Sequence, residues 1–288
     1  MVLDSTSGRL HPDLVACVVA GWLGRRRPAV VLMGAMWNHD AGLLGRIERV
    51  FVRLADRGID LYAVQSTEEL ELFARSWGVD RGKLRFVPYF ATITDTDASA
   101  PLAGEAADVF SGGDSHRDYE PLLAAALRLP QLRFVLATST LAHRNDLPPN
   151  VTAGWMDRLA FYSALRQAKA VVVPIRRNLD RAAGQQTYLN AMLLGKPTIV
   201  TDSPGVRDHV TAGETGFVVD GSVESYVEAL SSIFDPGRSS DIHAMGARAQ
   251  SVVATSFTFE RHAEAVLHVL GEAVSRRNAA RTVGRRSR

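Results

Sequence analysis

Residues 170–220 decide the fold of this chain, and they read AVVVPIRRNLDRAAGQQTYLNAMLLGKPTIVTDSPGVRDHVTAGETGFVVD. Residues 170–174 are apolar and mostly β-branched and end in a proline, which predicts a buried strand. Residues 185–194 carry apolar side chains at helical spacing, and Gly195 follows where a helix end favours glycine. A second buried strand is predicted at 198–201. A strand, a helix and a strand at this length predict a parallel, right-handed crossover unit.

This crossover unit also predicts where a ligand would bind. In parallel α/β sheets, ligands bind at the carboxyl ends of the strands, and anions bind at helix N-termini. The loop 176–186 and the turn 201–207 lie at those places. A phosphate group there would meet the backbone amides around the start of the helix, at Gly184, Gln185 and Gln186.

The order of motifs in this stretch resembles the donor-binding half of GT-B glycosyltransferases of the family 4 type (glycosyl transferases group 1). The resemblance rests on residues 189–220, with their Ala-Met, Gly-Lys-Pro and Gly-rich-turn motifs, and it extends over about 109–270 and more weakly over 30–89. In that family two glutamates, separated by seven residues, lie in and before the helix. The second glutamate position is Asn190 here and the first is Ala182.

What the resemblance implies is an α/β protein of the GT-B type, with two Rossmann-like domains and parallel sheets. It also implies transfer of a sugar from a nucleotide-diphosphate sugar to an acceptor hydroxyl, with retention of configuration and without a metal or other cofactor. The acceptor would be a sugar, a lipid-linked molecule or a small molecule. The expected division is 1–100 for a shortened acceptor-side domain, 101–270 for the donor-binding domain, and 271–288 for a helix end and basic tail.

Composition limits the remaining classes of function. The chain has 288 residues, 46% hydrophobic and 22% charged, which is enough for two domains with their own cores. A net charge of +2 gives no case for nucleic-acid binding. The single cysteine, Cys17, allows no internal disulfide and fits a cytoplasmic protein. The histidines show no metal-ligand spacing, and no apolar run reaches the roughly 18 residues of a membrane helix.

The N-terminal region is expected to form an incomplete domain. Only two to three strands are predicted before Pro88, at 29–36, 61–65 and 84–88, whereas the family's first domain begins with further strand–helix units. Either the true start lies upstream, or the domain is minimal, or a partner chain completes it. A sheet that lacks its first strands would expose an unpaired edge, which favours a partner chain or a homo-oligomer.

A helix is predicted at 12–23, with Trp22 at its end and three arginines at 25–27. It is either a packed helix or an interfacial helix that touches anionic lipid, which would make the protein peripheral to a membrane. At the other end of the chain, a last helix is predicted at 257–274. Residues 275–288 carry six arginines among small polar residues and are predicted to be disordered.

His39 follows the strand predicted at 29–36. The resemblance implies that His39 is the catalytic residue and faces the donor sugar. The alternative is a loop histidine next to Asp40, which would cap the following helix.

A glycine loop follows the first strand of the second domain, predicted at 108–111. Gly112 and Gly113 let backbone amides approach a diphosphate closely, and Arg117 would add a charge-assisted contact. In the family a Gly-Arg pair and a later lysine grip the diphosphate; Arg117 takes the lysine position and Gly112 the arginine position. Asp114 would locally repel phosphate. The alternative for this loop is a structural turn.

Further residues are expected near the nucleoside and the sugar. Trp155 and Met156 follow a predicted strand at 151–153, and the resemblance places them beside the nucleobase, where Trp155 would stack on the base or else be a core aromatic. Asn190 takes the place of the ribose-holding glutamate and can still hydrogen-bond a hydroxyl. Three arginines of the central loop would contact sugar or phosphate, or be solvated: Arg176, Arg177 and Arg181.

The sequence therefore predicts a glycosyltransferase in which helix amides and Arg117 meet the charge of the leaving group. Ala182, Asn190 and the short first domain leave a second reading open, a nucleotide-sugar-binding or partner subunit with weak or no catalysis. A GT-B epimerase or hydrolase is a third reading, but no acid–base pair of carboxylates supports it.

Overall fold

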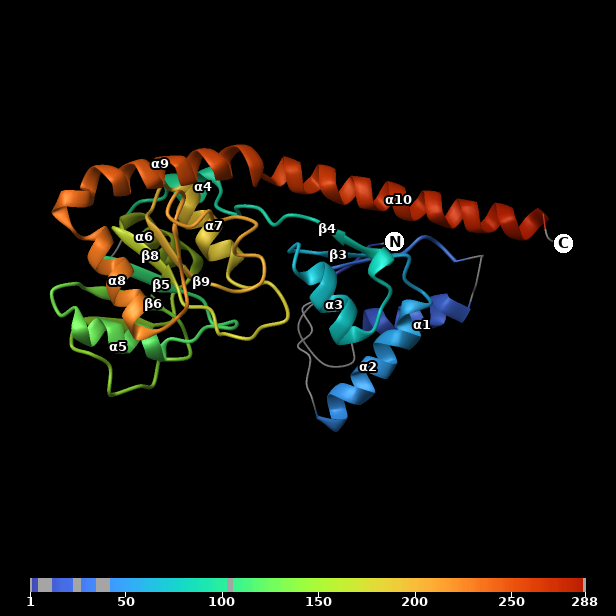
Figure 1. Ribbon diagram of the computed structural model, residues 1–288, viewed down its shortest axis with the longest axis horizontal. Coiled ribbons are helices and arrows are strands. Elements are labelled where there is room, and N and C mark those ends of the chain that lie inside the picture. The colour runs from blue at the N-terminus through green and yellow to red at the C-terminus, as the bar shows by residue number, and fades with distance from the viewer. Residues whose placement is uncertain (1, 5–11, 23–26, 35–41, 103–105, 287–288) are drawn as a thin grey trace. The chain divides into compact units, whose positions relative to one another are not determined.

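The computed structural model describes residues 2–4, 12–22, 27–34, 42–102 and 106–286, and Figure 1 shows their helices and strands. The chain forms two compact units. The first consists of Met1–Pro88, Asp180–Ala182 and Glu260–Arg288, and the second of Tyr89–Leu179 and Ala183–Phe259. This division differs from the expected boundaries near residues 100 and 270, because residues 89–100 lie with the second unit and Glu260–Arg288 with the first.

The first unit is built on a parallel sheet with the strand order β1-β2-β3-β4. Its strands are β1 (Val2–Asp4), β2 (Val31–Met33), β3 (Leu61–Val64) and β4 (Leu84–Phe86). The three predicted strands are confirmed. β1 was not predicted, because three residues are too few to show a period, and it pairs with β2 from Val2 opposite Val31. The sheet therefore has one more strand at this edge than the sequence predicted.

Helices cover both faces of this sheet. They are α1 (Pro12–Trp22), α2 (Leu43–Asp56) and α3 (Glu69–Trp77) on one face and α10 (Phe259–Arg286) on the other. Strand side chains alternate between the two layers: Leu32 and Tyr62 lie in the core with α1 and α3, whereas Val31 and Leu61 pack with Val269 of α10.

The C-terminal tail is helical, so the predicted disorder of residues 275–288 is wrong as far as Arg286. Arg276 forms an ion pair with Glu272 one turn earlier, at 2.8 Å, and donates to the carbonyl of Gly82. Glu272 also pairs with Arg85 of β4, and Arg277 lies 3.6 Å from Asp60. The arginines thus bind back to the sheet and extend the helix, where their composition alone predicted a solvated tail.

The second unit has a six-stranded parallel sheet with the order β10-β9-β8-β5-β6-β7. Its strands are β5 (Val109–Gly112), β6 (Phe134–Ala137), β7 (Val151–Gly154), β8 (Ala170–Val173), β9 (Thr198–Thr201) and β10 (Phe217–Val219). The strands predicted at 108–111, 151–153, 170–174 and 198–201 are confirmed as β5, β7, β8 and β9. Chain order runs outward in opposite directions from the β5–β8 pair, which makes this pair the topological switch point of the sheet.

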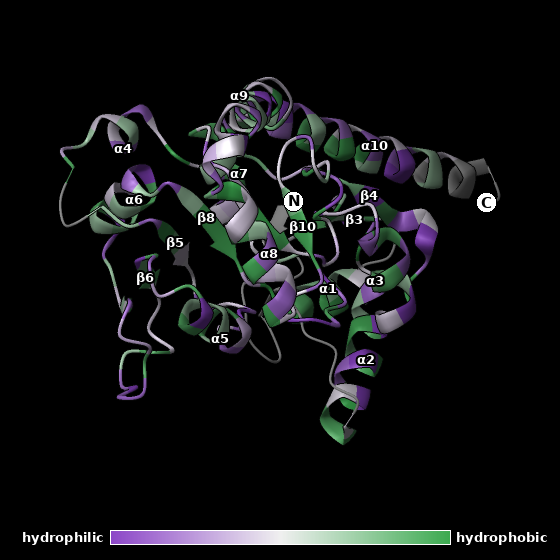
Figure 2. Ribbon diagram, turned by 60° about the vertical axis from the view of Figure 1, so that its left-hand side comes forward, coloured by the Kyte–Doolittle hydropathy of each residue, from purple (hydrophilic) through white to green (hydrophobic). Residues whose placement is uncertain are grey.

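Two helical layers enclose the second sheet. One face packs against α5 (Glu120–Arg128) and α8 (Val223–Ile233), and the other against α6 (Arg158–Gln167), α7 (Gln185–Leu193) and α9 (Ser239–Ser256). Figure 2 shows β8 in the colour of hydrophobic residues, as its burial from both faces requires. α9 was not predicted. Residues 92–100, which are small and polar and show no helical period, contain a capped helix, α4 (Asp95–Ser99).

The end of α7 confirms the predicted stop at Gly195. This glycine adopts a φ of 68°, which few other residues tolerate. Its amide donates to the carbonyl of Met192 at 2.9 Å, and the amide of Lys196 donates to the carbonyl of Ala191 at 3.0 Å. This pair of bonds is a Schellman motif, so Lys196 caps the helix through its backbone.

Candidate functional site

The switch point brings together the two loops that the sequence singled out. The amide of Arg176, after β8, donates to the carbonyl of His116 at 2.8 Å. In return the amide of Asp118, after β5, donates to the carbonyl of Pro174 at 2.8 Å. The glycine loop and the loop before α7 are therefore held side by side at the carboxyl ends of β5 and β8, as expected.

The two glycines of the first loop have packing reasons to be glycine. A Cβ on Gly112 would lie 2.3 Å from a ring carbon of Phe161. Gly113 has a φ of 108°, and its amide donates to the carbonyl of Ala137 at 3.0 Å. That amide is therefore occupied and does not point to a ligand. The structural-turn alternative accounts for both residues, and their contact with a diphosphate stays a prediction.

Arg117 extends from this loop to the first turn of α7. Its Nη2 lies 3.3 Å from Oγ1 of Thr187, while Nε donates to the carbonyl of Gly112 at 3.3 Å and Nη1 to that of Ser115 at 2.9 Å. Burial lowers the pKa of Arg117. Within the described residues it forms no ion pair with a carboxylate. A half-buried cation without a counterion thus lies beside the start of α7.

The start of α7 adds further positive potential. Gly184 caps the helix with a φ of 77°, and its carbonyl accepts from the amides of Thr187 and Tyr188. The first turn contains no acidic side chain. Because the first amides of a helix have no carbonyl partner within it, they favour an anion. Gln185 is buried, whereas Gln186 is exposed and reaches the hydroxyl of Tyr162 at 3.5 Å.

Thr187 is a site residue that the sequence reasoning missed. It lies in the first turn of a helix that was predicted correctly, so its position was available as a signal. In the turn after β9, the hydroxyl of Thr201 accepts from the amide of Ile175 at 3.1 Å and bonds the hydroxyl of Tyr226 at 2.6 Å. Thr201 therefore holds the start of the loop after β8 in place.

The carboxylate of Asp114 is held by the loop after β6. It accepts from the hydroxyl of Thr138 at 2.5 Å and from the amide of Ser139 at 2.9 Å. Partial burial raises the pKa of Asp114, but these hydrogen bonds outweigh it and the net shift is downward. Hydrogen bonds from the loop after β6 thus stabilise the negative charge of Asp114, which reduces the repulsion of phosphate expected from the sequence.

Asn190 is buried and uses its whole amide within the protein. Its Oδ1 accepts from the amides of Thr92 at 2.7 Å and Ile93 at 3.0 Å. Its Nδ2 donates to the hydroxyls of Thr92 at 3.0 Å and Tyr162 at 3.2 Å. The ribose contact that the resemblance implies would have to replace these bonds, and it stays a prediction.

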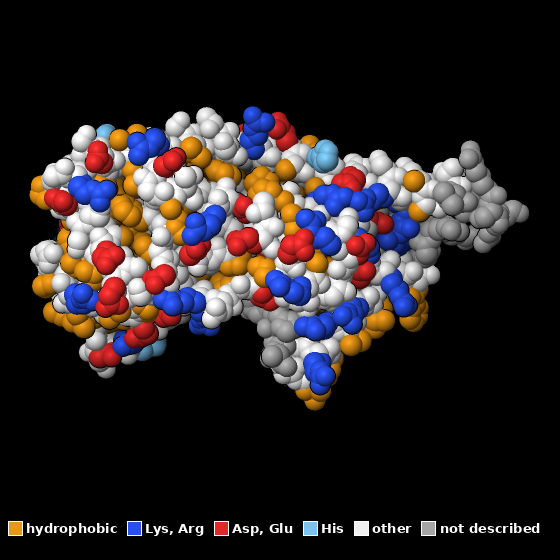
Figure 3. All heavy atoms as spheres, viewed as in Figure 1, with side chains coloured by type: hydrophobic (Ala, Val, Ile, Leu, Met, Phe, Trp, Pro, Cys, Tyr) orange, Lys and Arg blue, Asp and Glu red, His pale blue; other side chains and the backbone are white. Residues whose placement is uncertain are grey.

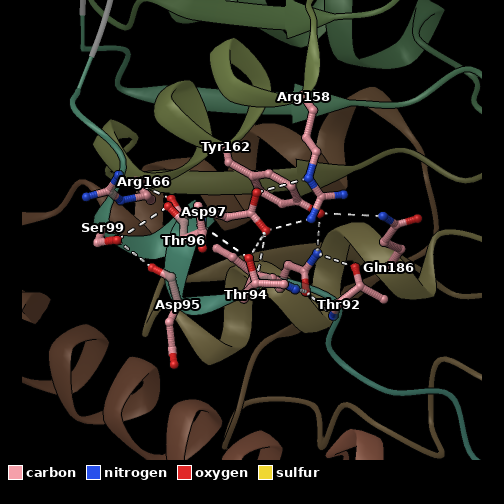
Figure 4. A network of polar contacts seen from close by, with 12 residues as sticks. Thr92, Thr94, Asp95, Thr96, Asp97, Ser99, Arg158, Tyr162, Arg166 and Gln186 are labelled. Carbon is pink, nitrogen blue, oxygen red and sulfur yellow. Dashed lines mark hydrogen bonds and ion pairs between the residues drawn. The ribbon is translucent and has the colours of Figure 1, made fainter.

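The segment around α4 belongs to the same polar network, which Figure 4 shows. Asp97 is 4% exposed and pairs with Arg158 of α6 through two bonds, at 2.6 and 3.0 Å. The Arg158 guanidinium lowers the pKa of Asp97 to about 2, and Thr94 adds a capping box. Arg166 donates to the carbonyl of Ala100 at 2.5 Å. Residues 92–100 are thus fastened to α6 and α7, although their composition is typical of a linker.

Trp155 and Met156 lie just beyond β7. Trp155 is 73% exposed, so it is not a core aromatic. Met156 is half-buried against the core of the second unit. An exposed indole is available for stacking on a base, and that role stays a prediction.

The three arginines of the central loop have different environments. Arg176 and Arg177 are exposed, and Arg177 lies 3.9 Å from Asp220. Arg181 is buried in the first unit, and burial lowers its pKa while Glu69 raises it. The structure therefore assigns Arg181 to a different unit from Arg176 and Arg177.

Glu69 of α3 contacts Ala182, the residue at the family's first glutamate position. Its carboxylate accepts from the amide of Ala182 at 2.9 Å and from that of Gln65 at 2.7 Å. Burial raises the pKa of Glu69, against the lowering effect of these bonds. No sequence pattern indicates this contact, because Glu69 and Ala182 are 113 residues apart.

His39 lies outside the described residues, so its role stays a prediction. The described part of the chain holds no group of three or more histidine, cysteine or acidic side chains that would bind a metal. In the same ranges, no helix has the length and apolarity needed to cross a membrane.

Residues 119–235 match the family model of glycosyl transferases group 1. This span runs from the start of α5 to the end of α8 and includes α7. Comparison with curated proteins gives no match. The matched residues belong to the second unit except for Asp180–Ala182, and they include Gly184, Thr187 and the central loop.

Solved structures show the same architecture along most of the chain. Sucrose-phosphate synthase from Thermosynechococcus elongatus is 18% identical with a TM-score of 0.67, over 90% of this chain and 72% of that one. A glycosyltransferase from Rickettsia africae is 10% identical with a TM-score of 0.70, over 95% and 76%. HepE from Anabaena, solved with UDP-glucose, is 16% identical with a TM-score of 0.65, over 96% and 78%. The chain has the α/β fold with parallel sheets of these GT-B glycosyltransferases.

Proposed function

We propose that this protein is a glycosyltransferase that moves a sugar from a nucleotide-diphosphate sugar to an acceptor hydroxyl. The observation that carries the proposal is the half-buried guanidinium of Arg117, 3.3 Å from Thr187 at the start of α7 and in no ion pair with a carboxylate of the described residues. A cation and a helix N-terminus that converge at a topological switch point favour a bound diphosphate. The family match over 119–235 supports the same conclusion.

In this proposal the diphosphate lies between the glycine loop and α7, and each group there has a role. Arg117 and the amides around Gly184, Gln185 and Gln186 stabilise the charge that develops on the leaving diphosphate. Gly112 keeps the loop close to the helix. Trp155 and Met156 contact the base, and Arg176 and Arg177 add long-range attraction for the phosphates.

His39 positions the sugar, the product keeps its anomeric configuration, and the reaction needs no metal, all as the resemblance implies. A chelator should therefore leave the rate unchanged. The acceptor is a hydroxyl of a sugar, a lipid-linked molecule or a small molecule. Because HepE was solved with UDP and with UDP-glucose, uridine donors are the first to test.

The proposal gives Asn190 a supporting role. Its amide closes four hydrogen bonds that join α7 to residues 92–93 and to Tyr162. An exchange of these bonds for ribose contacts would leave buried amides without partners, which is costly. We infer that Asn190 holds the frame of the site and that the ribose is bound by other groups.

Calorimetric titration with UDP, GDP, ADP and TDP tests the proposal. One nucleotide should bind to the wild-type protein, and Arg117→Ala should weaken it about 10- to 100-fold, as expected for a charge-assisted contact. Arg117→Lys keeps the charge but loses the forked geometry, so it should fall between the two. Arg128→Ala, an exposed arginine of α5 paired with Glu224, is the matched control. Absence of binding by all four nucleotides would refute the site.

A second candidate function is a nucleotide-sugar-binding or partner subunit with weak or no catalysis. The observation that favours it is that neither glutamate position carries a free carboxylate. Ala182 contributes only its backbone amide, which donates to Glu69, and the side chain of Asn190 forms hydrogen bonds within the protein. The two candidates differ in turnover. If the titration finds a nucleotide but its sugar conjugates are neither transferred nor hydrolysed with any acceptor class, the subunit reading holds.

A further inference from the structure

The second helix of the first unit carries an apolar stripe that faces solvent. Leu43, Ile47, Val50 and Leu54 recur at helical spacing and, with Leu44, are between 44% and 73% exposed. The residues of α2 that pack inward, Gly45, Val52 and Ala55, lie on the opposite side of the helix. α2 therefore has apolar residues on two opposite sides, one packed in the core and one facing solvent. Packing in the core does not explain the solvent-facing stripe.

The neighbouring helix adds to this surface. α1 packs against α2, and its inward residues are Leu14 and Cys17. On its outer side Val15 and Val19 are about half exposed, and Trp22 is 87% exposed. Figure 3 shows hydrophobic side chains along the lower edge of this unit, over α2 and α1. We call the exposed apolar side chains of these two helices the α1–α2 face.

Basic side chains border the apolar stripe. Arg46, Arg53 and Arg57 are exposed and follow the same helical spacing, displaced to one side of Ile47 and Leu54. None of the three forms an ion pair with a carboxylate within the described residues. The guanidinium of Arg53 lies close to Gly78.

Charge is also divided unevenly between the units. The first unit carries 20 Lys and Arg against 14 Asp and Glu, and the second carries 13 against 17. The net charge of +2 thus conceals a positive unit and a negative one. The apolar stripe lies on the positive unit, but most of the excess comes from Glu260–Arg288, whose helix α10 covers the other face of the sheet. Attraction of an anionic surface to the stripe therefore depends on Arg46, Arg53 and Arg57 beside it.

We propose that the α1–α2 face docks on an anionic lipid bilayer, with the aliphatic stripe and Trp22 inserted at the headgroup level and the arginines on the lipid phosphates. An aliphatic stripe with arginines on its border and a tryptophan at one end is the composition of an interfacial helix. Docking would hold the protein beside membrane-bound acceptors, but it does not depend on the transfer reaction.

Vesicle flotation of the full-length protein tests the docking. The protein should float with vesicles of phosphatidylcholine and phosphatidylglycerol, much less with phosphatidylcholine alone, and less as salt increases. Ile47→Asp with Val50→Asp should reduce the bound fraction at least about tenfold, because a charge is placed in the apolar layer. Leu127→Asp, at a 61% exposed leucine of α5, should bind like the wild type.

The electrostatic part has its own variants. Arg46→Gln with Arg57→Gln should weaken binding to the anionic vesicles by about fivefold for each arginine and leave the weak binding to phosphatidylcholine unchanged. Arg128→Gln is the matched control. Thermal melting of each variant shows that the fold is retained.

Three results would overturn the proposal. In the first, the wild type does not float with either kind of vesicle at low salt. In the second, the α2 variants float as well as the wild type. In the third, the protein forms a dimer that Ile47→Asp dissolves while lipid binding is absent, and the face is then an interface between copies of this chain.

Discussion

At the scale of single residues, the side chains that matter most are buried polar groups with distant partners. Asn190 bonds Thr92 and Ile93, which lie 98 and 97 residues away in the chain. Sequence pattern placed Asn190 correctly on a helix, but no pattern could pair it with a segment that reads as a linker. Its burial and its bonds appear only once the sheet brings the two segments together.

Replacing Asn190 by alanine should destabilise the second unit by about 2–4 kcal/mol, because it leaves two backbone amides and a tyrosine hydroxyl without their partner. Urea denaturation followed by fluorescence measures the change. Gln186→Ala, one turn earlier and exposed, should cost less than about 0.5 kcal/mol. Equal effects of the two variants would mean that the Asn190 bonds contribute little.

His209 should make stability depend on pH. It is 4% exposed, its Nδ1 donates to the carbonyl of Gly205 at 2.7 Å, and its Nε2 is buried without a partner among the described residues. Burial lowers the pKa of His209. The unfolded chain therefore binds the proton more readily, so this contribution is complete above about pH 6.5, the ordinary histidine pKa, and declines as the pH falls from there toward the lowered pKa.

Thermal melts between about pH 7 and pH 5 measure this dependence. The wild type should lose stability on acidification, and His209→Phe, which keeps an aromatic ring beside Phe257, should lose less. Substitution of the exposed His243 by glutamine is the control and should follow the wild type. A wild type and a His209→Phe variant with the same slope would show that this histidine does not titrate with unfolding.

At the scale of elements, strands such as β8 and β9 were predictable because each is a short run of buried, mostly β-branched residues ended by proline or a polar turn. The elements that were missed or mispredicted have no clear sequence pattern of their own. β1 is too short to show a period, and the end of α10 has the composition of a solvated tail but is held by Glu272 and Gly82. α4 was not predicted, because its residues are small and polar and its stability comes from contacts with α6.

Removing Asp97 should release α4 from α6. Asp97→Ala deletes the paired bonds to Arg158 and the capping box with Thr94, at a cost of about 1–3 kcal/mol. Hydrogen exchange at residues 94–99 should accelerate by about tenfold or more, with little change in the strands of the sheet. Asp95→Ala, at the exposed first turn of the same helix, is the control. Unchanged exchange in Asp97→Ala would show that α4 is held by packing alone.

At the scale of the whole molecule, the chain passes between its units at four places, and the passage after Ala182 leads directly into the candidate site. Asp180–Ala182 belongs to the first unit, where Glu69 holds the amide of Ala182 at 2.9 Å. Two residues later Gly184 caps α7 in the second unit. The start of the helix proposed to bind the diphosphate is therefore tethered, through two peptide units, to a carboxylate of the other unit.

Glu69→Ala should weaken nucleotide binding although Glu69 itself lies in the first unit. The loss of its bond to Ala182 lets the loop before Gly184 sample other conformations, and a ligand that needs one of them binds more weakly in proportion. We expect a decrease of about 3- to 10-fold in affinity by calorimetry, and faster exchange of the Ala182 amide. Glu71→Ala on the same helix, whose partner Arg81 lies 2.6 Å away at the surface, should change neither. If the Ala182 amide exchanges faster while the affinity stays constant, the tether does not reach the diphosphate site, and α7 alone sets its geometry.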